Sequence, residues 1–517
     1  MSPPASPAGP VSPLPPRRLI RTVVAGLLTA VFLAALDATV MATALPTIVG
    51  GFGGLDQYAW VVSAYLLTST AVMPLYGALS DRYGRRAVLR LAVLLFLLGS
   101  LLCAGAQEMS QLIAFRGVQG LGAGGLLVLA TTIISDLVPP RERARYQGLI
   151  GAVFGLASLA GPVLGGVLAE YEWRLIFLLN LPLGLLALLV TERVLRRVPS
   201  PPRSARRINY FGALLLVGGV ACLLLTATWG GRTYPWRSTE IVALAGSGVL
   251  LLGCWALKER WSREPLLPVS LFGRPTFAIG GLISCCFGAA MFGAITYLPI
   301  YLQVVQGHPP IAAGVLLLPL MGGIVLASLI GGRLITRFGR YKWVTVTGAT
   351  LMSGGTLATL TLRVESAPEQ LAGILALLGA GIGLLLQPLI VTMQHGLART
   401  QLGVATAAGT FLRQLGGVFG VAALGAVLTG WLSQTVGAQV VGLLREPQRI
   451  ATLPEPLLTE VRVAVVDGLH AAFAVATGFG LLCLLLTLAL PDRQIGPRRA
   501  EPAPSTPAPA PANTGGN

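Results

Sequence analysis

Residues 77–86 read GALSDRYGRR, and 255 positions later residues 332–341 read GRLITRFGRY. The two stretches share a pattern of glycine, leucine and arginine: Gly77, Leu79, Arg82, Gly84 and Arg85 recur as Gly332, Leu334, Arg337, Gly339 and Arg340. At the same offset, Gly161, Val163 and Gly165 match Gly416, Val418 and Gly420. An internal repeat of this length predicts two parallel halves related by an axis along the membrane normal, an architecture that transporters use.

The segments around these stretches are apolar. Of the 517 residues, 54% are hydrophobic and 11% are charged, whereas a soluble domain has about 25% charged residues. Segments of roughly 20 apolar residues predict membrane-crossing helices, because backbone polar groups in lipid must be satisfied within the segment. We predict fourteen of them, near 20–45, 57–79, 87–106, 111–135, 146–169, 174–192, 210–229, 239–257, 276–302, 311–332, 343–362, 371–394, 403–431 and 468–490.

The charges between the segments predict the orientation. The connections on the side of the two termini hold most of the 37 Lys and Arg residues, and the opposite connections hold most of the 20 Asp and Glu residues. The positive-inside rule then places both termini in the cytoplasm, in a multi-pass protein of the cell membrane. On this interpretation the net charge of +17 reflects topology, and we expect no nucleic-acid partner.

The fold class is therefore an all-α integral membrane protein of two six-helix bundles with an inserted two-helix hairpin. Within 457–466, the sequence LLTEVRVAVV is amphipathic and predicts a segment lying along the outer membrane surface. The expected divisions are a disordered tail (1–16), a first bundle (17–197), a linker and hairpin (198–265), a second bundle (266–492) with a long outer loop (432–467), and a second disordered tail (493–517).

The repeated stretch predicts a gating loop. Gly77 and Gly84 permit close helix approach and a tight reversal, and Asp81 lies among Arg82, Arg85 and Arg86. Ion pairs between these helix ends would hold while one face of a transporter is shut and break when it opens. The alternative is a loop that is basic only for topology. In the second copy, Thr336 replaces the acid between Gly332 and the group Arg337, Gly339 and Arg340, so a charge lock would be asymmetric.

Asp37 is the only acidic residue deep in a predicted span, and a charge at that depth costs several kcal/mol, roughly, which marks it as functional. Arg116 enters the membrane from the same surface, and a rise of about 1.5 Å per residue brings the two side chains to overlapping depths. Burial favours the neutral acid, whereas a neighbouring guanidinium favours the carboxylate. A carboxylate balanced between these states can carry a proton; the alternative is a static ion pair.

Other polar side chains in the spans are candidates for a substrate cavity. Arg413, followed by Gln414, faces either the central cavity or helix-end carbonyl groups. Trp60 and Tyr65 offer aromatic faces to a lipophilic substrate, and interfacial anchoring explains Trp60 equally well. Three glutamines are also candidates, although polar residues join helices without touching substrate: Gln119, Gln387 and Gln394.

Several motifs together resemble the fourteen-helix drug:proton antiporter branch of the major facilitator superfamily, over roughly residues 20–490. Besides GALSDRYGRR, they are LDATVMATALP (36–46), WVVSAYLL (60–67), RGVQGLGAG (116–124), GPVLGG (161–166), WRLIFLLNLPLG (173–184) and FLRQLGGVFG (411–420). The resemblance implies proton-driven export by alternating access. It implies that Asp37 and Arg116 serve the coupling, and that Gly161, Pro162, Gly165 and Gly166 form the antiporter-associated packing and hinge element.

We therefore expect a proton-coupled exporter of lipophilic or amphiphilic compounds. The single deep acid favours neutral, zwitterionic or anionic amphiphiles over dications. The alternatives are an exporter of lipids or an endogenous metabolite using the same proton step, and a proton-coupled importer of nutrients, against which GPVLGG argues. No phosphate-binding loop ending in GK[ST] is present, and the three histidines lack ligand spacing. We expect no enzyme activity, cofactor or metal, and a monomer whose partners are substrate, protons and lipid.

Overall fold

The computed structural model describes residues 17–52, 58–138, 140–196, 209–231, 234–262, 271–394, 397, 401–437 and 454–491. Both predicted tails, 1–16 and 493–517, lie outside the described residues. In the described part the elements of regular secondary structure are helices, and isolated bridge residues occur at Gly230, Tyr234 and Arg340.

A helix covers each of the fourteen predicted segments. Twelve of the helices in the described ranges are long and apolar enough to cross a membrane. Of the other two, α12 has 17 residues, and in α5 the described side chains form a continuous apolar stretch only over Gly148–Ala157. The helices are α1 (Arg17–Phe52), α2 (Tyr58–Tyr83), α3 (Arg85–Ala104), α4 (Met109–Leu137), α5 (Pro140–Glu172), α6 (Arg174–Leu195), α7 (Tyr210–Trp229), α8 (Thr239–Trp261), α9 (Pro275–Ile300, extended by the π-helical turn Tyr301–Val305), α10 (Pro310–Leu316), α11 (Leu318–Phe338), α12 (Lys342–Ala358), α13 (Pro368–Gln394), α14 (Leu402–Thr435) and α17 (Glu455–Leu488).

The packing of the helices repeats. In the first half α1 packs against α4, α5 and α6, while α3 packs against α4 and α6. In the second half α9 makes the same contacts with α13, α14 and α17, and α12 makes them with α13 and α17. The pair α2 and α4 corresponds to α11 and α13. The two halves therefore share one arrangement of helices, as the repeated sequence predicts.

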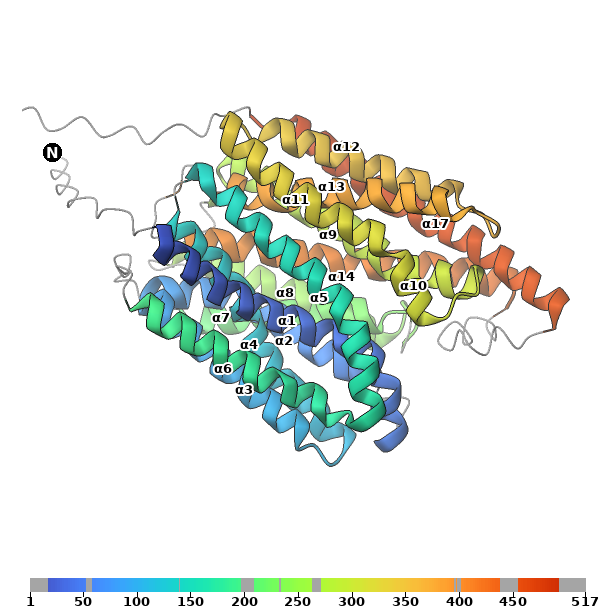
Figure 1. The fold of residues 1–517 in the computed structure, drawn as a ribbon, viewed down its shortest axis with the longest axis horizontal. Coiled ribbons are helices and arrows are strands. Elements are labelled where there is room, and N and C mark those ends of the chain that lie inside the picture. Colours follow the sequence, from blue (N-terminus) through green and yellow to red (C-terminus); the bar gives the residue numbers. More distant parts are fainter. Residues whose placement is uncertain are drawn as a thin grey trace, which may run out of the picture.

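Two main pairs of helices join the halves, α5 with α11 and α2 with α14 (Figure 1), and smaller contacts join α4 with α14 and α5 with α13. Small residues allow both main contacts: a Cβ added at Gly148 would lie 2.9 Å from the carbonyl oxygen of Ser328. The hairpin of α7 and α8 lies beside this junction, where α7 packs against α2 and α14 and α8 packs against α7.

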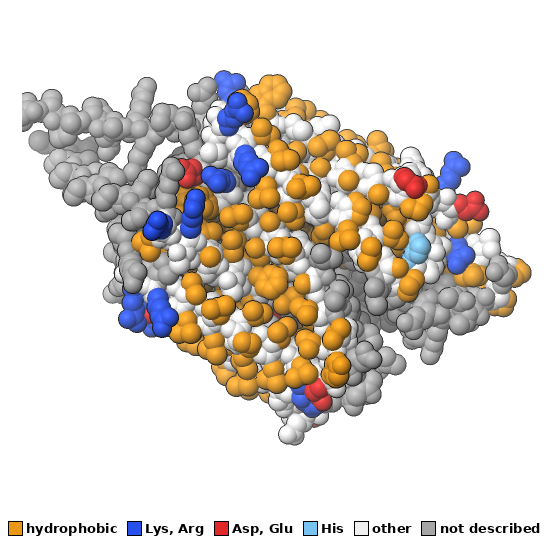
Figure 2. Space-filling model, in the orientation of Figure 1, with side chains coloured by type: hydrophobic (Ala, Val, Ile, Leu, Met, Phe, Trp, Pro, Cys, Tyr) orange, Lys and Arg blue, Asp and Glu red, His pale blue; other side chains and the backbone are white. Residues whose placement is uncertain are grey.

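The outside of the bundles is apolar. Leu98, Leu186 and Leu250 are each at least half exposed, and orange side chains cover the flank of the molecule in Figure 2. Lys and Arg side chains gather at the end where α1 begins, which we call the basic end (Figures 1 and 2). An apolar flank between polar ends matches a bilayer environment.

The predicted outer loop 432–467 is wrong in extent. Helix α14 continues to Thr435, and α17 begins at Glu455, so the amphipathic stretch 457–466 forms its first turns. Val461 and Val465 are buried against the second-half core. The apolar face that predicted a surface helix is thus satisfied by neighbouring helices. Residues 438–453 lie outside the described residues.

Candidate functional site

Asp37 lies inside the first half and is almost fully buried, with 1% of its surface exposed. Its carboxylate accepts three hydrogen bonds from two other helices. Arg116 Nη1 donates to Oδ2 at 2.7 Å, while Gln119 Nε2 and Asn180 Nδ2 each donate to Oδ1 at 2.8 Å. The structure therefore brings Asp37 and Arg116 together across α1 and α4. The ion pair is closed off from solvent in this conformation.

Arg116 is held from several sides. Its guanidinium donates to the Gln119 Oε1 atom at 2.7 Å, and its Nε donates to the Val61 carbonyl oxygen at 3.4 Å. The same group lies over the ring of Tyr65, 4.1 Å from the ring centroid, which is a cation–π contact. Because Val61 and Tyr65 belong to α2, a change in the charge of Asp37 would alter contacts of Arg116 that connect α1, α2 and α4.

Two members of this group were not predicted from the sequence. Asn180 of α6 donates to both Asp37 and Ser100, the latter at 2.9 Å, and the Ser100 hydroxyl donates to the Phe177 carbonyl oxygen at 2.9 Å. Gln119 also donates to Ser100. We call Asp37, Ser100, Arg116, Gln119 and Asn180 the carboxylate network. The network joins α1, α3, α4 and α6. Both carboxylate oxygen atoms of Asp37 accept hydrogen bonds from side chains of this network, so neither needs a water molecule.

The predicted gating loop forms a second charged cluster at the basic end. Arg85 pairs with Asp81 and, at 2.9 Å, with Asp136 of α4. Arg86 pairs with Glu192 of α6. We call Asp81, Arg85 and Asp136 the basic-end cluster. Sequence reasoning placed only Asp81 and the arginines in this loop. The acids that pair with these arginines from other helices, Asp136 of α4 and Glu192 of α6, lie 55 and 111 residues after Asp81, too far along the chain for the motif to reveal them.

The basic-end cluster contacts the other half. A Cβ added at Gly403, in the first turn of α14, would lie 2.5 Å from Asp81 Oδ1. The N-terminus of a helix favours a neighbouring carboxylate. A Cβ added at Gly77 would lie 2.7 Å from the Cβ of Ala407 and 2.9 Å from the Gly403 carbonyl oxygen. Gly84 adopts φ 93°, which glycine tolerates best, and so permits the tight reversal between α2 and α3.

The second copy of the loop differs. Gly339 adopts φ 65° and ends α11, so it reverses the chain as Gly84 does. Arg337 and Arg340 are exposed, however, and no ion pair to an acidic residue is seen for Arg337 in the described ranges. Arg82, the counterpart of Arg337, lies 5.2 Å from the centroid of the Tyr83 ring. The charge lock is thus asymmetric.

Gln394 bridges the halves instead of lining an open cavity. Its side chain is buried, and Nε2 donates to Ser135 of α4 at 2.9 Å and to Thr406 of α14 at 2.7 Å. Arg143 of α5 donates to the Gln394 Oε1 atom at 3.3 Å. Gln394 lies in the last turn of α13, where α4, α5 and α14 converge. At this position its side chain bonds to the other helices, whereas from the sequence it is a candidate for lining a substrate cavity. Gln119 is likewise buried in the carboxylate network.

Arg413 lies in α14 beside a cavity of about 10 Å³ lined by Ser284, Met393 and Gly409. That volume accommodates about one water molecule. Its side chain is half-buried, as is that of Gln414. The side chain of Gln387 lies outside the described residues. The structure therefore places Arg413 beside a small niche between α9, α13 and α14 whose lining is mainly apolar.

The two predicted aromatic residues have different surroundings. Tyr65 is buried beneath Arg116, and its hydroxyl group donates to the Ala34 carbonyl oxygen at 3.4 Å. Trp60 is half-buried and packs edge-on against Trp229 of the hairpin, with ring centroids 4.8 Å apart. Tyr65 thus belongs to the surroundings of the carboxylate network, while Trp60 links α2 to α7.

The glycine residues of the predicted packing and hinge element in α5 have different surroundings. A Cβ added at Gly161 would clash with Thr39, whose hydroxyl donates to the Ala157 carbonyl oxygen at 3.1 Å, so this residue allows α1 and α5 to touch. Gly165 is buried. Gly166 is exposed, and an added Cβ there would meet no atom of the described residues within 4 Å, so the structure gives no packing contact for this glycine in the described part of the chain. The side chain of Pro162 lies outside the described residues.

In the described part of the chain, no three His, Cys, Asp or Glu side chains are grouped so as to hold a metal ion. The polar sites are the carboxylate network within the first half and the contacts between halves at the basic end. Neither contains a nucleophile beside a base.

Comparisons with known proteins show which family this chain resembles. The family profile of the Major Facilitator Superfamily matches residues 27–421. The chain is 33% identical over 516 residues to the multidrug transporter protein MdtP of Bacillus subtilis, covering 93% of this chain and 94% of that protein. It is 32% identical to the efflux pump FUS6 of Gibberella moniliformis, covering 88% of this chain and 84% of the pump.

Solved structures show the same fold. The human organic anion transporter MFSD10 superposes with a TM-score of 0.64 at 18% identity, covering 92% of this chain and 100% of that one. The proton:xylose symporter XylE superposes with a TM-score of 0.62 at 14% identity, covering 92% and 97%. The two solved structures thus share the fold of this chain. The family profile and the sequence relatives show that the chain belongs to the major facilitator superfamily and is a membrane transporter, not an enzyme.

Proposed function

We propose that the protein exports lipophilic or amphiphilic compounds in exchange for protons, by alternating access. The observation that carries the proposal is the buried Asp37 carboxylate, held by Arg116, Gln119 and Asn180. An unpaired charge at this depth is costly, so a carboxylate retained there with a built partner set is a functional candidate. The multidrug transporters and efflux pumps among its relatives support the direction of transport.

The proton acts through helix packing. Protonation of Asp37 removes the Coulomb attraction to Arg116, and the guanidinium retains the Val61 carbonyl oxygen and the Tyr65 ring on α2. Because α2 also carries Gly77 and Asp81 at the contact with α14, a rearrangement of α2 reaches the interface between the halves. Protonation would thereby bias the halves between their two arrangements, which is the coupling that a secondary transporter needs.

The conformation described here fits one step of this cycle. The contacts between halves at the basic end include Gly77 with Ala407, Asp81 with Gly403 and Gln394 with Ser135. We assign this end to the cytoplasm from the charge distribution. The cytoplasmic side is then closed while Asp37 is paired and occluded. We further propose fourteen spans, with α5 and α12 crossing beside the twelve apolar helices, and α7 and α8 as an inserted hairpin.

Reconstitution into liposomes with an imposed pH gradient tests the proposal. Wild type is expected to accumulate an amphiphilic substrate against its concentration gradient, and Asp37→Asn is expected to lose accumulation. Glu108→Gln is the matched control, because Glu108 is an exposed acid directly before α4. Full accumulation by Asp37→Asn would refute the coupling role. Parallel assays with cationic dyes and lysolipids separate drug export from the alternative, export of lipids or an endogenous metabolite.

A further inference from the structure

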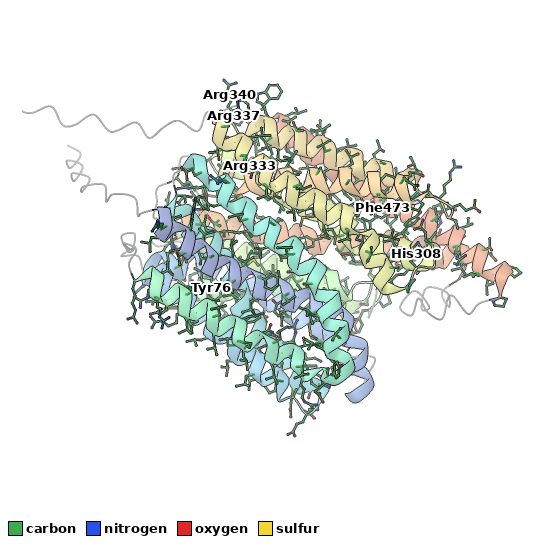
Figure 3. The ribbon with its side chains drawn as sticks, viewed as in Figure 1. Tyr76, His308, Arg333, Arg337, Arg340 and Phe473 are labelled. Atoms are coloured by element: carbon green, nitrogen blue, oxygen red, sulfur yellow. The ribbon has the colours of Figure 1, made fainter. Side chains whose placement is uncertain are left out.

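One face of α11 changes from apolar to basic along its length. Leu326, Ile330, Arg333 and Arg337 follow one another at spacings of four and three residues, which places them on a single stripe of the helix. Arg340 follows just beyond Gly339, where the helix ends. All five side chains are exposed. Figure 3 shows the three arginines where α11 reaches the basic end of the molecule. Leu326 and Ile330 come earlier in the helix and therefore lie nearer to its middle.

The stripe differs from its counterpart in the first half. There, Asp81 and Asp136 neutralise Arg85, and Glu192 pairs with Arg86. At the repeat offset of 255 positions, Asp81 corresponds to Thr336 and Asp136 to the buried Val391. The second copy keeps Arg337 and Arg340 at the positions of Arg82 and Arg85, has Tyr341 in place of Arg86, and adds Arg333 where the first copy has Ala78. It has no acid at the positions of Asp81 and Asp136.

Arg333 and Arg337 make no ion pair with an acidic side chain of the described ranges. Among the described residues, the guanidinium of Arg337 contacts the Phe338 ring, 5.7 Å from its centroid. Arg333 and Arg337 both fall within the apolar span Ala312–Phe338. Their charges therefore lie at the level where the headgroups of surrounding lipids begin, one or two turns from exposed apolar side chains.

We propose that Arg333 and Arg337 bind the phosphate headgroup of an anionic phospholipid whose acyl chains lie along Leu326 and Ile330. The order of the residues along the stripe matches the order of headgroup and acyl chain in a lipid of the same leaflet. Arginine forms charge-assisted, bidentate hydrogen bonds with phosphate, and basic clusters at membrane helices recognise anionic headgroups. The positive-inside rule explains a basic end, but it does not explain why only the second copy lacks acids.

The neighbouring half contributes to the same region. Helix α5 packs on α11 with Gly148 against Ser328, and the exposed Arg145 lies three residues before Gly148. At a rise of about 1.5 Å per residue, Arg145 and Arg333 both lie a few ångströms from this contact toward the basic end. A lipid headgroup on α11 is thus close to the seam between the halves.

Native mass spectrometry of the full-length transporter in detergent tests the proposal, with phosphatidylglycerol and phosphatidylcholine added as probes. Wild type is expected to retain phosphatidylglycerol in preference to phosphatidylcholine. Arg333→Gln/Arg337→Gln is expected to bind phosphatidylglycerol about 30-fold more weakly, because each basic residue near an anionic lipid contributes about fivefold. Intrinsic fluorescence confirms that the variant is folded.

The matched control is Lys258→Gln/Arg260→Gln, which removes two exposed charges from the last turn of α8 at the same end of the molecule. It is expected to bind phosphatidylglycerol as wild type does. An equal loss of binding in this control would mean that general surface charge attracts the lipid, and the proposed site would be refuted. Unchanged binding by Arg333→Gln/Arg337→Gln would refute it as well.

Discussion

A methyl group at Gly77 should push the two halves apart at the basic end. In the present structure the Cβ of Gly77→Ala would lie 2.7 Å from the Ala407 Cβ and 2.9 Å from the Gly403 carbonyl oxygen. Carbon atoms in good contact are about 3.5–4.0 Å apart, so α2 and α14 must separate by roughly 1 Å. Overpacking of this kind costs about 1–3 kcal/mol.

In the proposed alternating-access mechanism α2 and α14 separate at the basic end in the open arrangement, so the cost falls on the closed arrangement. An energy of about 1–3 kcal/mol shifts an equilibrium by about 5- to 150-fold, so Gly77→Ala is expected to favour the arrangement that is open at the basic end. The second substitution Ala407→Gly removes the nearest atom and is expected to restore part of the closed population. Such partial recovery is the signature of direct coupling between two sites.

Spin labels at the exposed positions Ala87 of α3 and Trp343 of α12 report the separation of the halves at this end. Double electron–electron resonance is then measured after replacement of the six native cysteines. The matched control is Gly166→Ala, whose Cβ would meet no atom of the described residues within 4 Å. Identical distance distributions in wild type and Gly77→Ala would refute the reasoning, as would an equal change in Gly166→Ala.

Three further substitutions test other contacts. Asn180→Leu removes one donor from the buried Asp37 carboxylate, and since hydrogen bonds to charged groups contribute about 1.5–3 kcal/mol, it is expected to lower the thermal unfolding temperature and gradient-driven transport together. Arg85→Gln leaves two carboxylates unpaired and is expected to destabilise the protein in detergent by about 3–5 kcal/mol, whereas the exposed Arg337→Gln should change stability by less than about 0.5 kcal/mol. Gln394→Leu loses three hydrogen bonds between helices, about 1 kcal/mol each, and should shift the same spin-label distances toward the open arrangement; unchanged distances would contradict its bridging role.

The overall fold was predictable because its signals are periodic and repeated. The spacing of glycine and arginine around Gly77 and Gly332 revealed two halves, and the structure shows the same helix packing in each. Helix ends were less predictable. The start of α17 at Glu455 was missed because an amphipathic stretch reads the same whether its apolar face meets lipid or other helices.

The site was predictable in its charged members only. A lone acid and a lone arginine at similar depth, Asp37 and Arg116, stand out in apolar sequence. Asn180 and Ser100 do not, because small polar residues are common in membrane helices and their orientation depends on which helices become neighbours. Gln394 fitted a cavity wall and a helix bridge equally well, and only the convergence of four helices decides between them.

Proton movement linked to substrate flux is the most direct test of the account. Liposomes containing the transporter and a trapped pH-sensitive dye are given a substrate gradient without an imposed pH gradient. Wild type is expected to move protons opposite to the substrate. Asp37→Asn is expected to let substrate run down its gradient with no accompanying proton movement, while Glu108→Gln behaves as wild type. Substrate-linked proton movement that persists in Asp37→Asn would contradict the assignment of coupling to this carboxylate.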